Sequence, residues 1–320
     1  MKGAEKMLDK KACPILVVGS LNMDLVVNTE RLPKAGETIF GKSFATFPGG
    51  KGGNQAVAVG KLGGKVAMAG CVGNDAFGKQ LIAGLAENKV DTDGIRVVDT
   101  ATGTALITVE ETGMNTIVVV AGANADCDIA DIDRALARFS VPGILILQHE
   151  IPAETVEYAI KQAKAKGWTI ILNPAPVRSI PEKLLALVDI LTPNESEASV
   201  LADLAVVSIE TAICAGEKLL AKGVKEVVIT LGGSGAVWVH KAGHKRIEAY
   251  QVKAVDTTAA GDSYTGAMAV ALAEGYDMPA SLDFAARTAA IAVTRPGAQT
   301  AIPTRAEVEA FDGSEGGHKE

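Results

Sequence analysis

Aromatic residues and long apolar runs are both scarce in this chain of 320 residues. Phe, Trp and Tyr make up only 4% of it, and no apolar run approaches the roughly 20 residues that span a bilayer. The first residues are charged and lack the apolar core of an export signal. Net charge is −7 with both signs interspersed, unlike a nucleic-acid-binding surface. We therefore expect a cytoplasmic protein that binds neither membranes nor nucleic acid.

Cysteine is also scarce, since the chain has only Cys13, Cys71, Cys127 and Cys214. These are too few for a disulfide scaffold, and their spacing matches no common metal-binding pattern. We expect each to pack as a small apolar side chain in a reducing compartment.

Small and aliphatic residues are abundant, and apolar residues make up 48% of the chain. Short apolar runs alternate with helical patterns, which is typical of strands buried on both faces by helices. The runs predict strands over residues 15–18, 65–69, 143–147, 169–172, 190–191 and 226–230, and helices over residues 154–166 and 211–222. We expect an α/β fold with a doubly wound, mainly parallel sheet.

Two stretches break this alternation, at residues 24–47 and 104–120. Turn residues separate short apolar segments at 26–27, 37–40, 44–47, 106–109 and 116–120, as in β-hairpins. We expect a small separate sheet, either a lid over the site or added strands without a functional role. Residues 13–311 are expected to form one α/β domain that includes these strands, with flexible ends at 1–12 and 312–320.

The segment Gly49-Gly50-Lys51-Gly52-Gly53-Asn54-Gln55 is rich in glycine and comes just before a helical pattern. Glycines let a backbone approach a ligand closely and adopt positive φ angles. The amides at a helix start favour anionic or oxygen-rich ligands. The spacing is neither a P-loop nor a dinucleotide-binding fingerprint. A ligand-binding loop and a plain structural turn both fit these residues.

A second segment, residues 256–267, leads into an Ala-rich helix and places Asp262 in its first turn. Ala259, Ala260 and Gly261 precede it and leave their amides uncovered by bulky side chains. A carboxylate beside exposed amides offers a base for an attacking hydroxyl and donors for a transferred phosphoryl group. A carboxylate that only caps the helix fits equally well.

Polar or glycine-rich residues also follow four expected strands, at the sheet edge where α/β folds bind ligands. Asn22 and Asp24 follow the first strand, and Glu150 follows strand 143–147. Asn194 and Glu197 follow strand 190–191, where a carboxylate suits Mg²⁺ held through water. Residues 230–235, Thr-Leu-Gly-Gly-Ser-Gly, suit the phosphates or ribose of a nucleotide. Each of these residues alone would also fit a turn.

Segments 49–54 and 256–267, in this order and at this separation, resemble the two signatures of the ribokinase-like sugar kinase family, of PfkB type. The likeness includes residues 19–24, 173–176, 185–189, 192–195, 230–232 and 289–299, and covers about residues 13–311. It implies transfer of the ATP γ-phosphoryl group to the 5-hydroxyl of D-ribose, with Mg²⁺ and an activating monovalent cation, usually K⁺. It also implies a homodimer formed through the lid.

The resemblance also assigns roles to residues. Asp262 would be the base, and the amides of Ala259, Ala260 and Gly261 would form an anion hole. The implied sugar-binding residues are Asn22, Asp24, Gly50, Lys51, Gly52, Gly53, Asn54, Glu150 and Asp262. The implied nucleotide-binding residues are Asn194, Thr230, Leu231, Gly232, Gly233, Ser234, Gly235, Gly261, Asp262 and Ala286, with Glu197 helping to position Mg²⁺. The implied monovalent-cation ligands are Asp256, Thr258, Ala292, Arg295, Gly297 and Ala301, mostly through backbone carbonyls.

Two positions depart from the family's pattern. Ala301 stands where a residue often offers a hydroxyl to the cation, and Ala286 stands where a polar side chain often borders the adenine. The acceptor could also be 2-deoxyribose, another pentose or a nucleoside, although residues 24–47 hold no aromatic pair arranged to stack on a base. A non-catalytic sugar or nucleotide sensor is a further alternative. The intact Asp262 and the small residues before it argue against a sensor.

Overall fold

A nine-stranded sheet organises the chain, in the order β13-β12-β11-β10-β9-β8-β1-β4-β5. The computed structural model describes residues 13–313. Of the ends expected to be flexible, 1–12 and 312–320, residues 1–12 and 314–320 lie outside the described residues. The strands are β1 (Ile15–Val18), β4 (Val66–Gly73), β5 (Asp91–Val98), β8 (Ile144–Leu147), β9 (Thr169–Leu172), β10 (Ile190–Leu191), β11 (Glu226–Thr230), β12 (Ala236–His240) and β13 (Gly243–Ile247). All pairs are parallel except those of β12 with β11 and β13. The expected doubly wound, mainly parallel sheet is confirmed.

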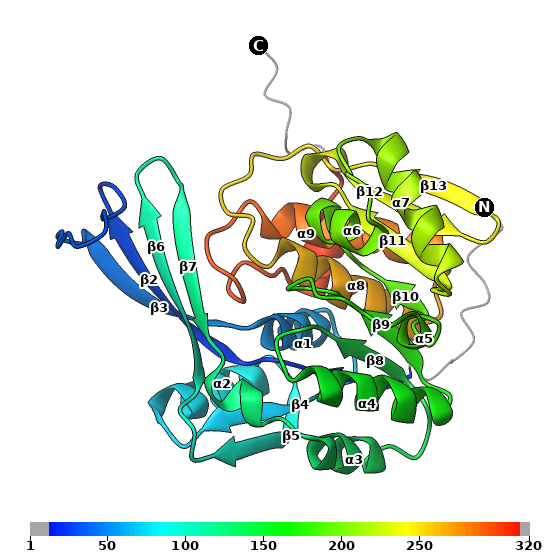
Figure 1. Cartoon of the computed structure of the whole chain (residues 1–320), viewed down its shortest axis with the longest axis horizontal. Helices are drawn as coiled ribbons and strands as arrows, with labels where there is room; N and C mark the ends of the chain where they lie inside the picture. Colours follow the sequence, from blue (N-terminus) through cyan, green and yellow to red (C-terminus); the bar gives the residue numbers. More distant parts are fainter. Residues whose placement is uncertain (1–12, 314–320) are drawn as a thin grey trace.

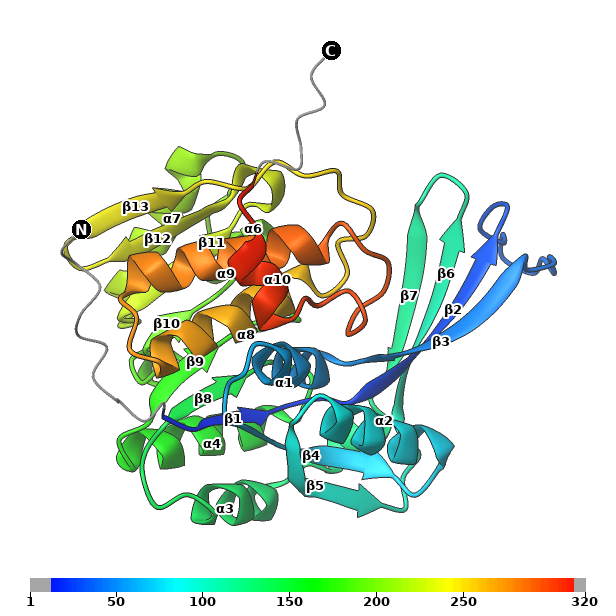
Figure 2. The ribbon, with the colours of Figure 1, turned by 180° about the vertical axis from the view of Figure 1, so that it is seen from behind.

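Helices cover both faces of this sheet (Figures 1 and 2). One face carries α3 (Ile129–Ala137), α4 (Ala153–Ala165), α5 (Glu182–Leu185), α6 (Glu195–Ala202) and α7 (Ile209–Ala221). The other carries α1 (Lys51–Lys61), α2 (Ala76–Glu87), α8 (Ala260–Ala273), α9 (Met278–Ala292) and α10 (Arg305–Ala310). Leu16 and Val18 of β1 pack in the first core, and Ile15 and Val17 in the second, which explains the unbroken apolar runs. Among the described residues no helix is both long and apolar enough to cross a bilayer.

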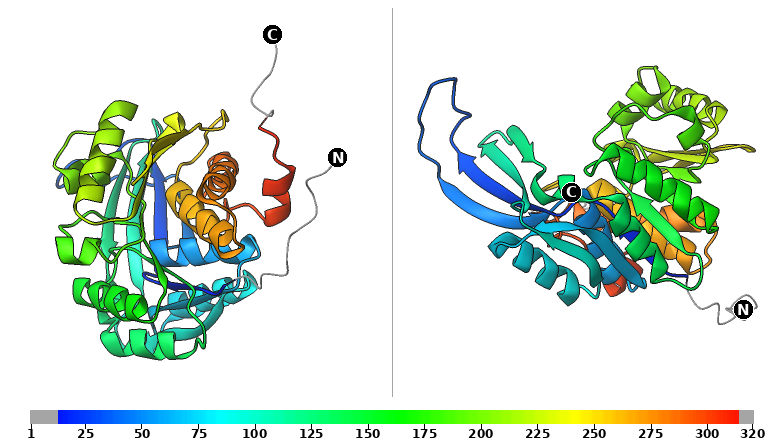
Figure 3. Two further views of the ribbon diagram at one scale, coloured as in Figure 1. Left: turned by 90° about the vertical axis from the view of Figure 1, so that its right-hand side faces the viewer. Right: turned by 60° about the horizontal axis from the view of Figure 1, so that its bottom comes forward.

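A separate four-stranded sheet, which we call the lid sheet, projects from the body (Figures 1 and 3). Its order is β3-β2-β6-β7, from β2 (Asn22–Thr29), β3 (Ser43–Gly49), β6 (Gly103–Glu110) and β7 (Asn115–Val120). β2 and β3 form one antiparallel hairpin, β6 and β7 form another, and β2 pairs with β6 in parallel. The small sheet expected from the hairpin patterns is therefore present.

The strand expected at 37–40 is wrong, because these residues belong to the connection between β2 and β3. Glu37 accepts hydrogen bonds from the Arg31 side chain and, at 3.0 Å, from the amide of Lys34, which closes a local turn. Phe40 is 97% exposed. Within residues 13–313 no core covers Phe40 and no strand pairs with residues 37–40, so nothing there favours an extended conformation.

Candidate active site

A cavity of about 490 Å³ lies at the carboxyl ends of β9, β10 and β11, against the N-terminus of α8. Twelve of the implied site residues line it: Lys51, Asn194, Glu197, Thr230, Gly232, Gly233, Gly235, Ala259, Ala260, Gly261, Asp262 and Ala286. Leu231 lies in the hydrophobic core instead, and Ser234 is not among the lining residues. Asn173 also lines the cavity, although sequence analysis gave it no role. Its position directly after β9, like that of Asn194 after β10, was the available signal.

Asp262 reaches this cavity because α8 packs closely on α1. A β-carbon at Gly266 would lie 2.6 Å from the β-carbon of Ala58, closer than real carbon atoms approach, so glycine permits the contact. One turn earlier on α8, Asp262 meets the first turn of α1. Its partner there, Asn54, is 208 positions away in the sequence.

Two side-chain amides from α1 hold the carboxylate of Asp262, which is 6% exposed. Asn54 Nδ2 donates to Oδ2 at 3.0 Å, and Gln55 Nε2 donates to Oδ1 at 2.8 Å. Asn54 Oδ1 is buried without a partner among the described residues, so it can accept from a hydroxyl. Gln55 was given no role at the level of sequence, and its only signal was that it follows Asn54 in the same motif.

The turn before Asp262 offers main-chain donors to the cavity. Ala259 has a φ of 58°, a left-handed conformation that is unusual for a residue with a β-carbon. The amide of Ala260 already donates to the carbonyl of Thr257 at 3.2 Å. Within the described residues, the amides of Ala259, Gly261 and Asp262 have no acceptor. They lie at the N-terminus of a 14-residue helix, where the dipole favours an anion.

The glycine-rich segment differs from the sequence expectation in where its helix begins. α1 begins at Lys51, so Gly52 and Gly53 lie in its first turn, and within the segment only Gly50, at 82°, has a positive φ. Close packing is the reason, because a β-carbon on Gly52 would lie 2.7 Å from the carbonyl carbon of Gly19. The glycines therefore bring the start of α1 against the end of β1.

Glu150 and Asp24 bring two further carboxylates near Asp262. Glu150 Oε2 accepts from the hydroxyl of Ser20 and, at 3.0 Å, from the amide of Lys51. Burial raises the pKa of Asp24 to about 7, and the negative charges of Glu150 and Asp262 add to the rise. A group of carboxylates that can accept hydrogen bonds, close to Asp262, suits a ligand with several hydroxyls.

Lys51 supplies the opposing positive charge. Burial alone would lower the pKa of its ammonium, but the carboxylates of Asp262, Glu150 and Glu197 outweigh this effect and raise the pKa. Lys51 therefore stays protonated at the edge of the cavity, where it can attract a phosphate.

Asn22 opens β2 and is buried. Its Oδ1 accepts from Asn124 Nδ2 at 2.7 Å, and Asn124 Oδ1 accepts from the amide of Leu21 at 2.8 Å. These bonds fix the orientation of the Asn22 amide, so its Nδ2 is the donor left for a ligand. Asn124 lies in η1 (Gly122–Asp126), outside every motif found in the sequence, and no sequence signal marked it.

Asn194 and Glu197 form a reciprocal cap at the start of α6. The Asn194 side chain accepts from the amide of Glu197, and Glu197 Oε2 accepts from the amide of Asn194, both at 2.9 Å. Burial raises the pKa of Glu197 more than these hydrogen bonds and the charge of Lys51 lower it. The cap holds Glu197 at the cavity wall, and its carboxylate keeps lone pairs that suit a hard cation such as Mg²⁺.

An apolar wall closes the far side of the cavity. It is formed by α9 and by the chain after β12, with the residues Ala286, Ala289, Ala290, Val293, Ile247 and Tyr250. Such a slot suits the flat face of a nucleotide base. Ala286 offers no side-chain hydrogen bond to that base.

The implied cation ligands are partly brought together. Asp256 accepts from the amides of Thr258 at 2.8 Å and Gly297 at 2.9 Å, which joins the turn before α8 to the loop after α9. Burial raises the pKa of Asp256, but these donors outweigh it and lower the pKa overall. Arg295 and Ala292 are linked by a backbone hydrogen bond, from N to O, at 3.2 Å. Ala301 bonds to Ala298 in the same way. A carboxylate and backbone carbonyls are ligand types that suit K⁺, but the contacts in this structure bring amide groups, not carbonyls, to Asp256.

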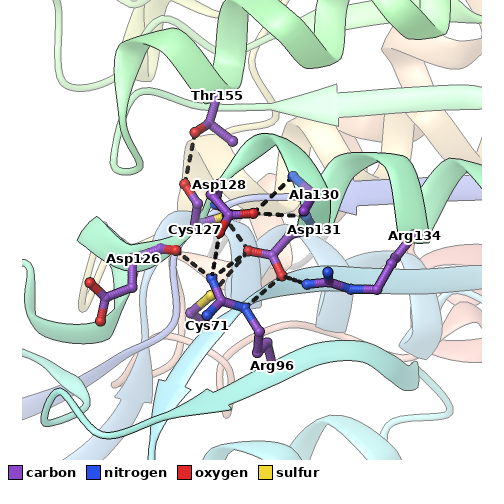
Figure 4. Close-up of polar contacts among 9 residues, drawn as sticks. All are labelled: Cys71, Arg96, Asp126, Cys127, Asp128, Ala130, Asp131, Arg134 and Thr155. Atoms are coloured by element: carbon purple, nitrogen blue, oxygen red, sulfur yellow. Dashed lines mark hydrogen bonds and ion pairs between the residues drawn. The ribbon is translucent and has the colours of Figure 1, made fainter.

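A cluster of Cys71, Cys127 and Asp131 lies in the core on the opposite face of the sheet from α8 (Figure 4). The ligand atoms of the three residues lie within 4.8 Å of one another. However, the oxygens of Asp131 accept two bonds from Arg96, at 2.8 and 2.9 Å, and another from Arg134. The guanidinium groups of Arg96 and Arg134 therefore occupy the oxygens that a metal ion would need. The bonds to Arg96 anchor α3 to β5.

The cysteines pack only partly as expected. Cys71 and Cys127 are buried, Cys13 is half-buried, and Cys214 is exposed on α7. The expectation of apolar burial is wrong for Cys214, because its position falls on the outer face of that helix.

Comparison with known proteins gives consistent results. Residues 14–305 match the model of the pfkB family carbohydrate kinases. A ribokinase of Schizosaccharomyces pombe is 43% identical over 306 residues, covering 92% of this chain and 96% of that protein. A deoxyribokinase of Salmonella typhi is 35% identical over 292 residues, covering 91% and 95%.

The fold has a similarly close match. The structure of the Arabidopsis thaliana ribokinase complexed with ribose and ATP has a TM-score of 0.84 and 36% identity, and the likeness covers 93% of this chain and 98% of that one. The family match, the identity over nearly the whole chain and the shared fold agree: the chain belongs to the pfkB family of carbohydrate kinases.

Proposed function

We propose that this chain transfers the γ-phosphoryl group of ATP to the 5-hydroxyl of D-ribose. The observation that carries the proposal is the buried carboxylate of Asp262, held by Asn54 and Gln55 beside the free amides of Gly261 and Asp262 at the cavity. The names of the relatives and the ribose- and ATP-bound Arabidopsis structure support the choice of sugar and phosphoryl donor.

In the proposed reaction the ribose 5-hydroxyl oxygen attacks the γ-phosphorus while its proton passes to the carboxylate of Asp262. The new O–P bond forms as the bond between the γ-phosphorus and the leaving oxygen of ADP breaks, which yields ribose 5-phosphate and ADP. The amides of Gly261 and Asp262 donate to the phosphoryl oxygens, where negative charge accumulates. The turn of Ala259 and Ala260 holds those amides in place.

The sugar is proposed to lie between Asp262 and the carboxylates of Asp24 and Glu150. Asn22 and Asn54 offer their free amide atoms to its hydroxyls, with Lys51 and the backbone of residues 50–53 beside them. The nucleotide is proposed to fill the cavity, with its phosphates toward Asn194, Lys51 and the 230–235 loop, and its base against Ala286.

Two cations belong to the proposal. Glu197 would hold Mg²⁺ through water, and Mg²⁺ supplies charge neutralisation at the phosphates. Asp256 and the carbonyls of residues 258, 292, 295, 297 and 301 would hold K⁺. Because Asp256 ties the loop at Gly297 to the turn before α8, the residues that hold K⁺ also shape the anion-binding amides.

We further propose that residues 13–311 act as one domain in which the lid sheet covers the sugar and forms a homodimer. Support comes from β7, all six residues of which are exposed. Ile117, Val118, Val119 and Val120 are each about half exposed or more, at 54%, 60%, 53% and 49%. An apolar strand at a sheet edge favours pairing with another copy. A cytoplasmic location goes with the proposal, because the phosphoryl donor is ATP.

Phosphorylation of 2-deoxyribose is a second candidate, favoured by the likeness to the Salmonella typhi deoxyribokinase. Asp24 is the residue placed to distinguish the two sugars, because a carboxylate can accept from two neighbouring hydroxyls. A comparison of kcat/KM for ribose and 2-deoxyribose decides between them.

Replacement of the base tests the proposed chemistry. Asp262→Asn keeps the size of the side chain but removes the proton acceptor, so we expect kcat to fall about 10²–10⁴-fold while ATP and ribose still bind. The measurement is ADP release coupled to a spectroscopic assay, with binding followed by calorimetry. Asp99→Asn, at an exposed carboxylate, is the control. Near-normal turnover by Asp262→Asn would refute the proposed role of Asp262.

A further inference from the structure

We propose that Gln55 is a positioning residue that holds Asp262 in one orientation, and that Gln148 acts through Gln55. The inference rests on the proposed function, because it concerns the base of that reaction. It adds two fully buried residues outside the cavity lining, Gln55 and Gln148, and it assigns the proton to one oxygen of Asp262.

The first step is the hydrogen bonding of the Gln55 amide, which is fully buried. One hydrogen of Nε2 is directed to Asp262 Oδ1 at 2.8 Å. The same nitrogen lies 3.4 Å from Asn173 Oδ1, a weaker contact that takes the second hydrogen. Asn173 is fixed in turn, because its Nδ2 donates to the carbonyl of Thr192 at 2.8 Å. Both hydrogens of the Gln55 amide therefore have acceptors with fixed positions.

The second step is the choice of which end of the Gln55 amide faces Asp262. Gln148 Nε2 donates to Gln55 Oε1 at 2.6 Å, in a buried contact. If the Gln55 amide were rotated by half a turn, Oε1 would face the carboxylate and Nε2 would face another NH₂ group. Both contacts would be repulsive. Gln148 therefore keeps the donor end of Gln55 toward Asp262.

The third step is the position of Gln148 itself, directly after β8. A β-carbon on Gly19, directly after β1, would lie 1.9 Å from Gln148 Oε1. Glycine at residue 19 thus makes room for the Gln148 amide between the ends of two neighbouring strands. Among the described residues Gln148 Oε1 has no hydrogen-bond partner, so the contact with Gln55 is the hydrogen bond that this amide makes.

These contacts distinguish the two oxygens of Asp262. Oδ1 is bonded to Gln55, which no solvent reaches, and Oδ2 is bonded to Asn54, which is 6% exposed. Because Asn54 has a free Oδ1 for a sugar hydroxyl, Oδ2 is the oxygen on the ligand side. We infer that Oδ2 takes the proton, while Gln55 prevents the carboxylate from turning away.

The test compares Gln55→Met, Gln148→Met and the double variant with the wild-type chain. Methionine keeps the approximate length of glutamine without its donor. Thr288→Val is the control, because Thr288 is fully buried and, in the part of the chain that the structure describes, its hydroxyl donates only to Phe284 O within α9. We measure kcat, the KM for ribose and for ATP, and Tm.

Misplacing a catalytic group by about 1 Å can lower the rate about 10²-fold, so we expect Gln55→Met to lower kcat about 10–100-fold. Both KM values should stay within about twofold.

The double variant tests whether Gln148 affects kcat through its hydrogen bond to Gln55. If Gln148 acts through Gln55, adding Gln148→Met to Gln55→Met lowers kcat little further, whereas Gln148→Met alone lowers it several-fold. The inference is overturned if Gln148→Met leaves kcat unchanged, or if the two losses multiply. It is also overturned if Thr288→Val lowers kcat as much at a similar Tm. A wild-type chain that phosphorylates no sugar refutes the proposed function and this inference together. An active wild type with an equally active Gln55→Met refutes this inference alone.

Discussion

Gly49 and Asp24 lie so close in the lid sheet that a β-carbon at residue 49 would sit 2.4 Å from Oδ2 of Asp24. The two residues belong to the paired strands β3 and β2, where Gly49 faces Asn22 and Asp24 faces Phe47. The carboxylate of Asp24 occupies the space that any other side chain at residue 49 would fill. Glycine at residue 49, expected from the sequence in a glycine-rich loop or turn, is therefore required by the position of the Asp24 side chain.

Gly49→Ala is expected to weaken sugar binding. The added methyl group displaces the carboxylate of Asp24, so the KM for ribose should rise about tenfold or more, while the KM for ATP changes little. Steady-state kinetics with each substrate varied in turn measure both constants. Gly84→Ala is the matched control, because a β-carbon there would meet no atom within 4 Å from any other part of the described structure apart from its own helix backbone and chain neighbours. An equal rise in both KM values would contradict a local effect on the sugar.

The stability of the sugar-free chain should depend on pH through Asp24. Its folded pKa of about 7 lies above the unfolded value near 3.9, so its ionisation opposes folding. The cost is absent below about pH 4, grows as the unfolded chain ionises, and is complete above about pH 7. Asp24→Asn should therefore raise Tm at pH 8 but not at pH 4. Thermal unfolding at both pH values tests this, with Asp99→Asn as control. A gain in Tm that is the same at both pH values would contradict the raised pKa of Asp24 in the folded chain.

Asp256→Asn should weaken activation by K⁺. Asparagine removes the charge and places an NH₂ group against one of two amides that now donate to the carboxylate, those of Thr258 and Gly297. We expect the K⁺ concentration for half-maximal kcat to rise at least severalfold, and the KM for ribose to change less. The assay titrates KCl while tetramethylammonium chloride keeps the ionic strength constant. Unchanged K⁺ dependence would remove Asp256 from the cation site.

Val118→Lys should produce a monomer. Val118 lies opposite Leu106 in the lid sheet, and the two are 60% and 49% exposed. A lysine at an edge strand opposes pairing between copies because its charge would have to be buried. Sedimentation velocity measures the mass in solution. Val207→Lys, at an 84% exposed valine outside the lid sheet, is the control and should remain a dimer. If the wild-type chain is itself a monomer, the homodimer proposal is wrong.

Much of this architecture could be predicted from the sequence because buried parallel strands leave a strong local signal. β1, β9, β10 and β11 have the residues expected of them. β4 extends four residues past its expected end. Gly70, Cys71 and Gly73 gave no strand signal in the sequence, and their place in the strand follows from its burial on both faces.

The site was harder to predict where a role depends on contacts between distant segments. Asp262 could be proposed as the base from its own segment. Gln55 and Asn124 could not, because their roles come from partners about 207 and 102 positions away. The start of α1 was placed too late for a related reason. Glycine disfavours a helix locally, and only the close approach of Gly52 to Gly19 makes it necessary there.

The contact between α1 and α8 has a consequence for synthesis on the ribosome. The Asn54 and Asp262 side chains that meet there are separated by 208 positions. A nascent chain can build most of its sheet long before the base has been translated. Until its last fifth emerges, such an intermediate has the carboxylates proposed to bind the sugar but lacks Asp262, the proposed base. If Asp262 is the base, a prematurely terminated product is inert as a kinase and does not consume ATP in a futile reaction.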